Sequence, residues 1–397
     1  MSELNYLEKL LDGTEVEWKA LGDVTSVLRG KRLTKNLLSA EEKFPVFHGG
    51  LEPLGYYNKS NRPANTVMII NVGASAGTVG YSTVDFWSSD GCFCLEHNEL
   101  LNNRFLYFAL IGYQSLLKSK VRVAGIPTLD AIVVNKLLIP IPCPENPEKS
   151  LAIQSKIVRI LDRFSALTAE LTAELNMRKK QYNYYRDQLL SFDESSVEWK
   201  TLLEACDYVD YRGKTPKKTQ SGIFLVTAKN IRMGYIDYHA SQEFISEEDY
   251  AIVMRRGLPK KGDVLITTEA PCGFVAQVNR ENIALAQRVI KYRSKNTQLS
   301  NSFLKHYLLG SQFQDKLMQA ATGSTVKGIK GSRLHQLKIP IPSKVEQDRI
   351  VAILDKFDTL TNSITEGLPR EIELRQKQYE YYRDLLFSFP KPETISN

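Results

Sequence analysis

Polar side chains that could contact a polyanion gather in two separate stretches of this sequence. The first stretch supplies Arg29, Lys31, Arg32, His48, Lys59, Asn71, Ser75, Arg122 and Thr128. The second supplies Arg212, Lys214, Thr215, Lys217, Lys218, Lys229, Asn230, Glu269, Gln287, Arg288, Thr325 and Lys327. Cations of this kind bind phosphates, whereas forked and amide groups bind the edges of bases. The two sets are therefore candidates for contacts with duplex DNA.

Different roles are expected within the second set. Lys217 and Lys218 are predicted to bind phosphates. Base reading is predicted for Arg212, Asn230, Glu269, Gln287 and Arg288. The Glu269 carboxylate can accept a hydrogen bond from a cytosine amino group, or it can cap a turn. A single Lys or Arg is more often exposed to solvent than bound to a ligand. The DNA-binding prediction therefore rests on each set of loop residues taken together.

The sequence contains no motif that would supply catalysis. Adenine methylation needs an Asn/Asp-Pro-Pro-aromatic motif, and no Pro-Pro occurs. Residues 73–80 do not fit GxGxxG, and Gly213-Lys214-Thr215 lacks the earlier Gly of a Walker A loop because Tyr208 stands there. The five Cys are scattered apart from one CxC, which disfavours a structural zinc site. We therefore predict no catalytic residue and no metal ligand in this chain.

The two polar stretches lie in two copies of one plan. Residues 16–19, 139–142, 157–164 and 181–187 return in the same order as residues 197–200, 339–342, 350–357 and 378–384. Between these matches, each copy has the pattern of a buried strand, a Gly-containing turn, a second strand and later an amphipathic helix. A shared scaffold with different polar loops is typical of two modules that perform one task on two targets.

A long helix is predicted after each variable block. Residues 151–192 have no Gly or Pro, and their apolar residues recur in steps of three and four, as in a coiled-coil seam. The predicted seam consists of Ile157, Ile160, Phe164, Leu167, Leu171, Leu175, Tyr182, Tyr185 and Leu189, then Ile350, Leu354, Phe357, Leu360, Ile364, Tyr379, Tyr382 and Leu386. Gly367-Leu368-Pro369 predicts a kink or break in the second helix. These side chains are expected to pack against each other or against other subunits.

These elements predict an α+β fold with two globular recognition domains, built from mixed, twisted sheets and helices. Two long antiparallel coiled-coil helices separate the domains, and a pseudo-two-fold axis relates the two copies. The predicted boundaries are 1–150 for the first domain with a short leading helix at 3–12, 151–192 for the central helix, 193–343 for the second domain, 344–389 for the distal helix and 390–397 for the tail.

The helical segments also carry a family resemblance. Its motifs are Ile-Pro-Ile-Pro-Cys-Pro-Glu-Asn-Pro-Glu at 139–148, a doubled Thr-Ala-Glu-Leu at 168–175, the segment 177–187 and Phe-Pro-Lys-Pro-Glu-Thr at 389–394. With these motifs the whole chain resembles the specificity subunit of type I restriction-modification enzymes, and in detail the type IC subfamily.

The resemblance implies a non-catalytic DNA-recognition subunit, each of whose domains reads one half of a split duplex site. It implies assembly with two modification (methyltransferase) subunits and with restriction/motor subunits, which hold the S-adenosylmethionine, ATP and Mg. It also implies that the number of Thr-Ala-Glu-Leu copies sets the unread spacer, with two copies giving the shorter class. Four helical residues add about 6 Å, comparable with one or two base pairs.

Composition agrees with this resemblance without proving it. The 52 Lys and Arg exceed the 45 Asp and Glu by seven, a mild excess that permits a polyanion partner. No stretch approaches the ~20 apolar residues of a membrane span, and the polar N-terminus is no signal peptide, so a cytoplasmic protein is expected. The alternative is a coiled-coil assembly scaffold whose globular domains bind proteins rather than DNA. That alternative explains the helices but not the shared frame with varied loops.

Overall fold

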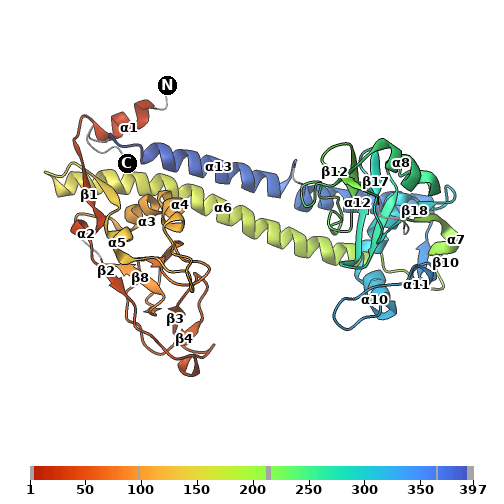
Figure 1. Cartoon of the computed structure of the whole chain (residues 1–397), viewed down its shortest axis with the longest axis horizontal. Helices are drawn as coiled ribbons and strands as arrows, with labels where there is room; N and C mark the ends of the chain where they lie inside the picture. The colour runs from red at the N-terminus through yellow and green to blue at the C-terminus, as the bar shows by residue number, and fades with distance from the viewer. Residues whose placement is uncertain (1–3, 97–98, 212–215, 364, 391–397) are drawn as a thin grey trace. The chain divides into compact units, whose positions relative to one another are not determined.

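The computed structural model describes residues 4–96, 99–211, 216–363 and 365–390, and it divides the chain into two compact units (Figure 1). Unit 1 is Met1–Glu170 with Glu373–Asn397, and unit 2 is Leu171–Ile372. The dividing point lies inside the long helix α6 (Pro147–Leu189). Each recognition block is therefore compact together with the part of the long helices that it contacts.

Unit 1 is built on a four-stranded antiparallel sheet in the order β2-β8-β5-β6. The strands of this unit are β1 (Val16–Ala20), β2 (Val27–Arg29), β3 (Phe44–Phe47), β4 (Gly55–Tyr57), β5 (Thr66–Ile70), β6 (Val79–Ser82), β7 (Trp87–Ser88), β8 (Cys92–Leu95) and β9 (Leu138–Pro142). Strand β5 is buried along its whole length, as its apolar run predicts for a central strand. A smaller sheet, β4-β3-β7, extends the block, and β1 pairs with β9.

The helices of unit 1 cover this sheet and lead into the long helix. They are α1 (Leu4–Leu11), α2 (Leu21–Val24), η1 (Lys35–Leu37), α3 (Asn103–Gly112), α4 (Gln114–Ser119) and α5 (Ala131–Asn135), with the first part of α6 and most of α13 (Leu368–Leu386). Helix α3 packs Phe105 against Phe387 and Phe389, which follow α13. In Figure 1, α13 runs beside the first part of α6 in the opposite direction.

Unit 2 repeats the sheet order of unit 1. Its strands are β10 (Glu198–Thr201), β11 (Cys206–Asp210), β12 (Lys218–Thr219), β13 (Ile223–Val226), β14 (Phe244–Ile245), β15 (Val264–Thr268), β16 (Cys272–Gln277), β17 (Ile283–Leu285), β18 (Val289–Ser294) and β19 (Lys338–Ile341). The antiparallel sheet β11-β18-β15-β16 corresponds to β2-β8-β5-β6, and the parallel pair β13-β17 corresponds to β3-β7. Even the register returns, because Trp18 lies opposite Pro140 and Trp199 opposite Pro340. The internal repeat is therefore confirmed at the level of strand pairing.

The helices of unit 2 also follow the order of unit 1. They are α7 (Leu202–Ala205), α8 (Glu247–Val253), η2 (Met254–Arg256), α9 (Asn301–Leu309), α10 (Ser311–Ala320), α11 (Gly331–Leu334) and α12 (Lys344–Asn362). Among the described residues, no helix has both the length and the apolar character that a bilayer span requires.

The long helices begin and break where local chemistry dictates. Helix α6 starts at Pro147, four residues before the predicted start, because Pro lacks the N–H that the first turn leaves unpaired anyway. The predicted break is confirmed, since α12 ends at Asn362 and α13 begins at Leu368. Gly367 between them has φ +80°, and a Cβ there would lie 2.4 Å from the Thr359 carbonyl oxygen. Only Gly fits this turn without strain.

The predicted seam is present in part. Ile157, Tyr182, Ile350, Leu354 and Leu386 are buried, and repeat-related rings stack in both units, Phe164 on Tyr382 and Phe357 on Tyr182 and Tyr185. Three of the predicted seam residues are instead exposed, Leu167 and Tyr382 by 37% and Tyr185 by 47%, although the two Tyr rings keep their stacking contacts. The completely buried Leu161 had not been predicted, because steps of four through Ile153 and Ile157 follow the straight helix better than the heptad pattern does. Ile364 lies outside the described residues.

A buried glutamine joins each long helix to its recognition block. In unit 1, Gln154 accepts a hydrogen bond from the Asn102 backbone N–H (2.8 Å) and donates to the Leu100 carbonyl (2.9 Å). In unit 2, Gln347 accepts from the Ser300 N–H (2.8 Å) and donates to the Gln298 carbonyl (2.7 Å). Asn102 and Ser300 are the N-cap residues of α3 and α9. The same carboxamide therefore fixes the same helix start in both units.

Replacing Gln347 with Leu is expected to lower the free energy of unfolding by roughly 1–3 kcal/mol, because the buried Pro342 carbonyl and the part-buried Ser300 N–H lose their partner. Chemical denaturation of the chain in its assembled complex measures the change. Gln336→Leu, at an exposed position of the same unit, is the matched control. Equal unfolding midpoints for the two variants would contradict the role assigned to Gln347.

Candidate nucleic-acid interface

Three polar segments meet at one edge of the main sheet in unit 2. We call residues 267–270, 287–288 and 322–328 the unit 2 turn cluster. The Thr268 N–H donates to the Arg288 carbonyl, and the Ile329 N–H donates to the Thr268 carbonyl, both at 2.9 Å. The Arg288 Nε lies 3.6 Å from the Glu269 Oε2, with both side chains about half exposed. Backbone pairing therefore brings a guanidinium and a carboxylate together on the surface.

A cavity of about 350 Å³ opens beside this cluster. Its walls include four of the predicted DNA contacts, namely Lys218, Lys229, Gln287 and Arg288. Lys218 is ion-paired to Glu243 at 2.9 Å, and Lys229, Gln287 and Arg288 are exposed. Cationic and amide groups in one concave site can contact a phosphate and a base edge at the same time.

One predicted base-reading residue is wrong. Asn230 is completely buried, and its carboxamide is used within the turn. Its Oδ1 accepts from the Thr227 backbone N–H (3.0 Å) and hydroxyl (2.9 Å), while its Nδ2 donates to the Asp237 and Ser241 carbonyls (2.9 and 2.8 Å). A carboxamide with all its bonds satisfied inside the protein stabilises the turn and is not available to a base.

The other predicted residues of unit 2 fall into two groups. Lys217, Thr325 and Lys327 are exposed, and the last two lie in the turn cluster. Arg212, Lys214 and Thr215 lie outside the described residues.

Unit 1 has a matching cluster. We call residues 48–50, 71–77 and 122–128 the unit 1 turn cluster. Arg122 and Thr128 exchange backbone hydrogen bonds of 2.9 and 3.0 Å, and the Gly73 N–H donates to the Pro127 carbonyl at 2.9 Å. Thr322 pairs with Gly328 in the same way in unit 2. The Arg122 guanidinium lies 3.0 Å from Asp130.

The predicted residues of unit 1 gather only partly in this cluster. His48, Ser75, Arg122 and Thr128 lie in it, and Asp90 links His48 (3.4 Å) to Arg29, whose Nε donates to the Asp90 carbonyl. Asn71 also lies in the cluster, but its side chain is only 2% exposed, so its predicted DNA contact is wrong for this conformation. The remaining candidates, Lys31, Arg32 and Lys59, are exposed.

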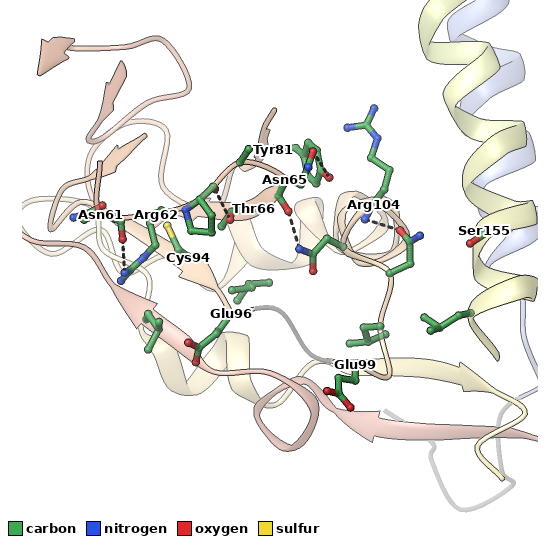
Figure 2. Close-up of a pocket in the computed structure, with 18 residues that line it drawn as sticks. Asn61, Arg62, Asn65, Thr66, Tyr81, Cys94, Glu96, Glu99, Arg104 and Ser155 are labelled. Atoms are coloured by element: carbon green, nitrogen blue, oxygen red, sulfur yellow. Dashed lines mark hydrogen bonds between the residues drawn. The ribbon is translucent and has the colours of Figure 1, made fainter. Parts of the chain in front are cut away.

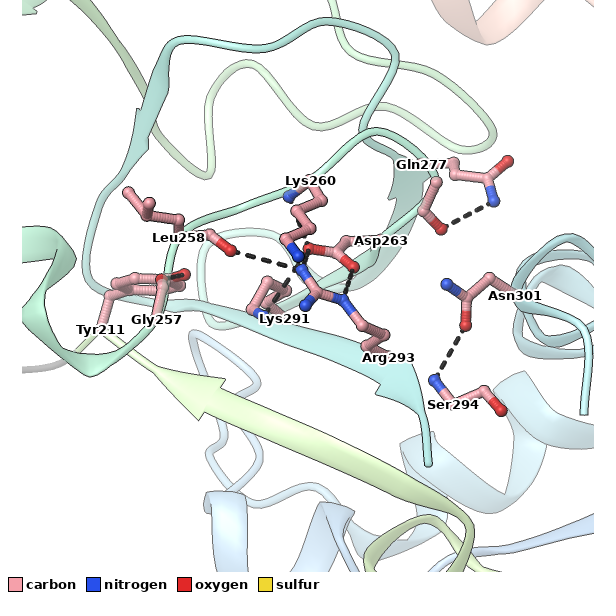
Figure 3. Close-up of polar contacts among 11 residues, drawn as sticks. Tyr211, Gly257, Leu258, Lys260, Asp263, Gln277, Lys291, Arg293, Ser294 and Asn301 are labelled. Atoms are coloured by element: carbon pink, nitrogen blue, oxygen red, sulfur yellow. Dashed lines mark hydrogen bonds and ion pairs between the residues drawn. The ribbon is translucent and has the colours of Figure 1, made fainter. Parts of the chain in front are cut away.

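An ionic network supports the opposite end of the strands that carry the unit 2 turn cluster (Figure 3). Asp263 is buried just before β15 and accepts two hydrogen bonds from Arg293 on β18, of 2.6 and 2.7 Å. Lys291 lies 3.6 Å from the same carboxylate, and its burial lowers its pKa. The hydrogen bonds that Arg293 donates to Asp263 raise the pKa of Arg293. Strands β15 and β18 pair antiparallel, so Asp263 and Arg293 lie at one end of the pair and Arg288 lies at the other. The Asp263 carboxylate balances the charges of Lys291 and Arg293 at its end.

Aspartates at repeat-related positions anchor each block to its long helix. In unit 1, Arg104 on α3 bonds Asp162 on α6 at 2.8 Å and stacks its guanidinium over Tyr81. It also lines a cavity of about 1050 Å³ (Figure 2). In unit 2, the buried His306 bonds Asp355 at 2.7 Å, and this hydrogen bond lowers the pKa of that carboxyl. The aspartate is thus kept, while its partner changes. Sequence reasoning missed this cavity and both anchors.

The comparisons with known proteins agree over the whole chain. A family model described as "Type I restriction modification DNA specificity domain" matches residues 14–178 and 199–374. The specificity subunit of the EcoR124I/EcoR124II type I restriction enzyme of Escherichia coli is 43% identical, with 100% of each chain covered. The EcoprrI specificity subunit of Escherichia coli is 35% identical, with 92% of this chain and 93% of that one covered.

Solved structures support the fold. The crystal structure of a type I restriction-modification S subunit from M. genitalium has a TM-score of 0.59 at 19% identity, covering 96% of this chain and 98% of that one. A chain from a study of assembly and conformational transition of the type I restriction-modification system has a TM-score of 0.57 at 18% identity, with 94% and 97% covered.

Replacing Asp263 with Asn is expected to destabilise unit 2 by about 3 kcal/mol, because Lys291 and Arg293 lose their shared carboxylate while Arg293 keeps part of its solvation. Hydrogen exchange should accelerate in β15 but not in the corresponding β5. Asp315→Asn, at an exposed position of unit 2, provides the control. Unchanged exchange in β15 would show that the network carries no such support.

Proposed function

This chain belongs to the family of type I restriction-modification DNA specificity subunits, and we propose that each of its turn clusters reads one half of a bipartite duplex target. Members of this family recognise the DNA target and are not themselves catalytic. They assemble with other subunits of the restriction-modification system. Residues 1–150 and 193–343 are the proposed recognition domains, with 151–192 and 344–389 as the helical regions between them and 390–397 as the tail.

The duplicated turn clusters are the observation that supports this proposal. Both are held by the same backbone pairing at the same sheet edge, yet their side chains differ. By the matching backbone pairs, unit 2 has Glu269, Gln287 and Arg288 where unit 1 has Val72, Asp90 and Gly91. Unit 1 also has His48 and Arg122 nearby. An identical frame with different donors and acceptors is what two readers of different base sequences require. This variation also favours DNA over the alternative of a coiled-coil assembly scaffold whose globular domains bind proteins, because that alternative does not explain why the loops vary on a shared frame.

The spacer between the half-sites is proposed to follow from the length of α6. The two Thr-Ala-Glu-Leu copies occupy residues 168–175, and the division between the units falls inside the first copy. A change of helix length there alters the separation of the units without touching either turn cluster. With two copies and the type IC resemblance, we infer the shorter spacer class.

Two modification subunits are proposed to dock on a repeated aromatic surface. Tyr184 with Tyr185, and Tyr381 with Tyr382, form the same edge-to-face pair in both units, with ring centroids 5.4 Å apart. All four rings are exposed, by 37 to 62%. Two copies of one surface suit two copies of one partner. In this proposal, the methyltransferase and restriction subunits supply S-adenosylmethionine, ATP and Mg.

Replacing Tyr184 with Ser is expected to remove one of two modification subunits, because it changes the exposed unit 2 surface and keeps the stack of Tyr185 on Phe357. Native mass spectrometry of the co-purified complex measures the stoichiometry. Tyr235→Ser, at an exposed Tyr within the unit 2 recognition block, should leave both partners bound. Retention of two partners by Tyr184→Ser would refute the docking proposal.

Replacing Arg288 with Ala is expected to weaken binding to the specific duplex by about 5- to 150-fold, the effect of losing one bidentate base contact. Binding to unrelated duplexes should change much less. Lys261→Ala removes an exposed cation of the same unit outside the turn cluster and serves as the control. The assay is a titration of the assembled complex with labelled duplex at fixed salt. An equal loss on specific and unrelated DNA would reduce Arg288 to a phosphate contact.

A further inference from the structure

One exposed aliphatic residue recurs at the same place in both turn clusters. Ile126 is 71% exposed and Val326 is 54% exposed. They occupy equivalent positions, because the bridges Arg122 with Thr128 and Thr322 with Gly328 flank them at the same spacing. Exposing an aliphatic side chain to water is unfavourable. We call Ile126 and Val326 the apolar tips, and their recurrence in both units indicates that each makes a contact with a partner.

The other exposed aliphatics near these loops do not recur. Val123 is 79% exposed and Ile132 is 67% exposed, but the equivalent residues of unit 2 are Gly323 and Ser332. The position of Ile126 and Val326 therefore differs from its neighbours in being aliphatic in both copies.

The loop backbone holds these side chains in place. In unit 1 the Thr128 hydroxyl donates to the Ile126 carbonyl at 2.9 Å, within the Arg122–Thr128 bridge. In unit 2, Gly323 approaches Val326 so closely that a Cβ would lie 2.1 Å from the Val326 carbonyl oxygen. Ile and Val are also stiff at χ1, so little side-chain freedom is lost when either is enclosed.

The surroundings of both tips suit a polyanion. Exposed Lys118, Lys120 and Arg122 precede Ile126, with no Asp or Glu between residues 116 and 129, and Asp130 pairs with Arg122 alone of these three at 3.0 Å. In unit 2, Lys327, Lys330 and Arg333 follow Val326, again with no acidic residue between 322 and 333. An aliphatic tip inside a cationic rim matches nucleic acid, where bases offer apolar surface between rows of phosphates.

We propose that Ile126 and Val326 insert against the bases of the duplex as apolar wedges, one in each half of the target, and partly unstack a base step there. This inference rests on the proposed reading of bipartite DNA. Each wedge adjoins the segment that would read the bases, since Glu269 bridges to Gly328 and Val72 to Thr128. Local unstacking would give the side chains of the turn clusters better access to the base edges. The free energy needed to unstack the bases would depend on the DNA sequence at that step.

The test uses the chain assembled with its modification subunits and a specific duplex carrying 2-aminopurine at successive positions of one half-site or the other. Wild-type complex should raise the fluorescence in both halves. Ile126→Ser should abolish the rise in only one half, and Val326→Ser in only the other. Each should weaken specific binding by roughly tenfold or more, as expected when an aliphatic side chain loses its enclosure.

Ile132→Ser is the matched control, because it removes an exposed aliphatic from the same unit and installs the residue found at position 332. It should keep the wild-type signal. Wild-type fluorescence and affinity in both wedge variants would overturn the inference while leaving DNA reading intact. Loss of modification subunits from the wedge variants would overturn it in favour of a protein contact. A wild-type complex that does not discriminate between duplex sequences would instead overturn the proposed function itself.

Discussion

A buried carboxamide couples recognition to the long helices in both halves of this protein. Gln154 and Gln347 each satisfy a backbone N–H at the start of a recognition helix and a carbonyl in the preceding turn. Both glutamine side chains are buried. Removing either carboxamide would leave part-buried backbone groups of the block without a partner, at a cost of about 1–3 kcal/mol. The start of α3 and the start of α9 are therefore each fixed to a long helix.

Charge reinforces this coupling in a way that differs between the copies. Asp162 and Asp355 hold equivalent places on the helices, but the first binds Arg104 and the second binds His306 and Lys305. The helix side of the contact is preserved, and the recognition side is free to change its cation. A conserved helix residue with a variable partner is expected where a constant helical region carries recognition blocks that differ. The turn clusters show the same contrast, because their backbone pairing is shared and their side chains differ.

Much of the architecture could be predicted from the sequence, because repeats and periodicity report directly on it. The duplication, the long helices and the break at Gly367 are all confirmed. Burial was harder to predict, because it depends on residues distant in sequence. Asn230 has a side chain that could read a base, but its own turn encloses it. Gln154 is buried by contacts with Leu100 and Asn102, about fifty residues earlier in the chain. The contacts of individual turn residues with bases stay predictions, since local sequence does not encode the partner.

The central claim is that α6 sets the distance between two independent reading surfaces. Inserting a third Thr-Ala-Glu-Leu after Leu175 adds about 6 Å of helix and leaves both turn clusters unchanged. Thr172→Ala, which preserves the length, is the control. Methylation mapping in a strain carrying each variant with its partner subunits gives the half-sites and the spacer together. The account predicts the same two half-sites with a longer spacer for the insertion only; an altered half-site, or an unaltered spacer, would contradict it.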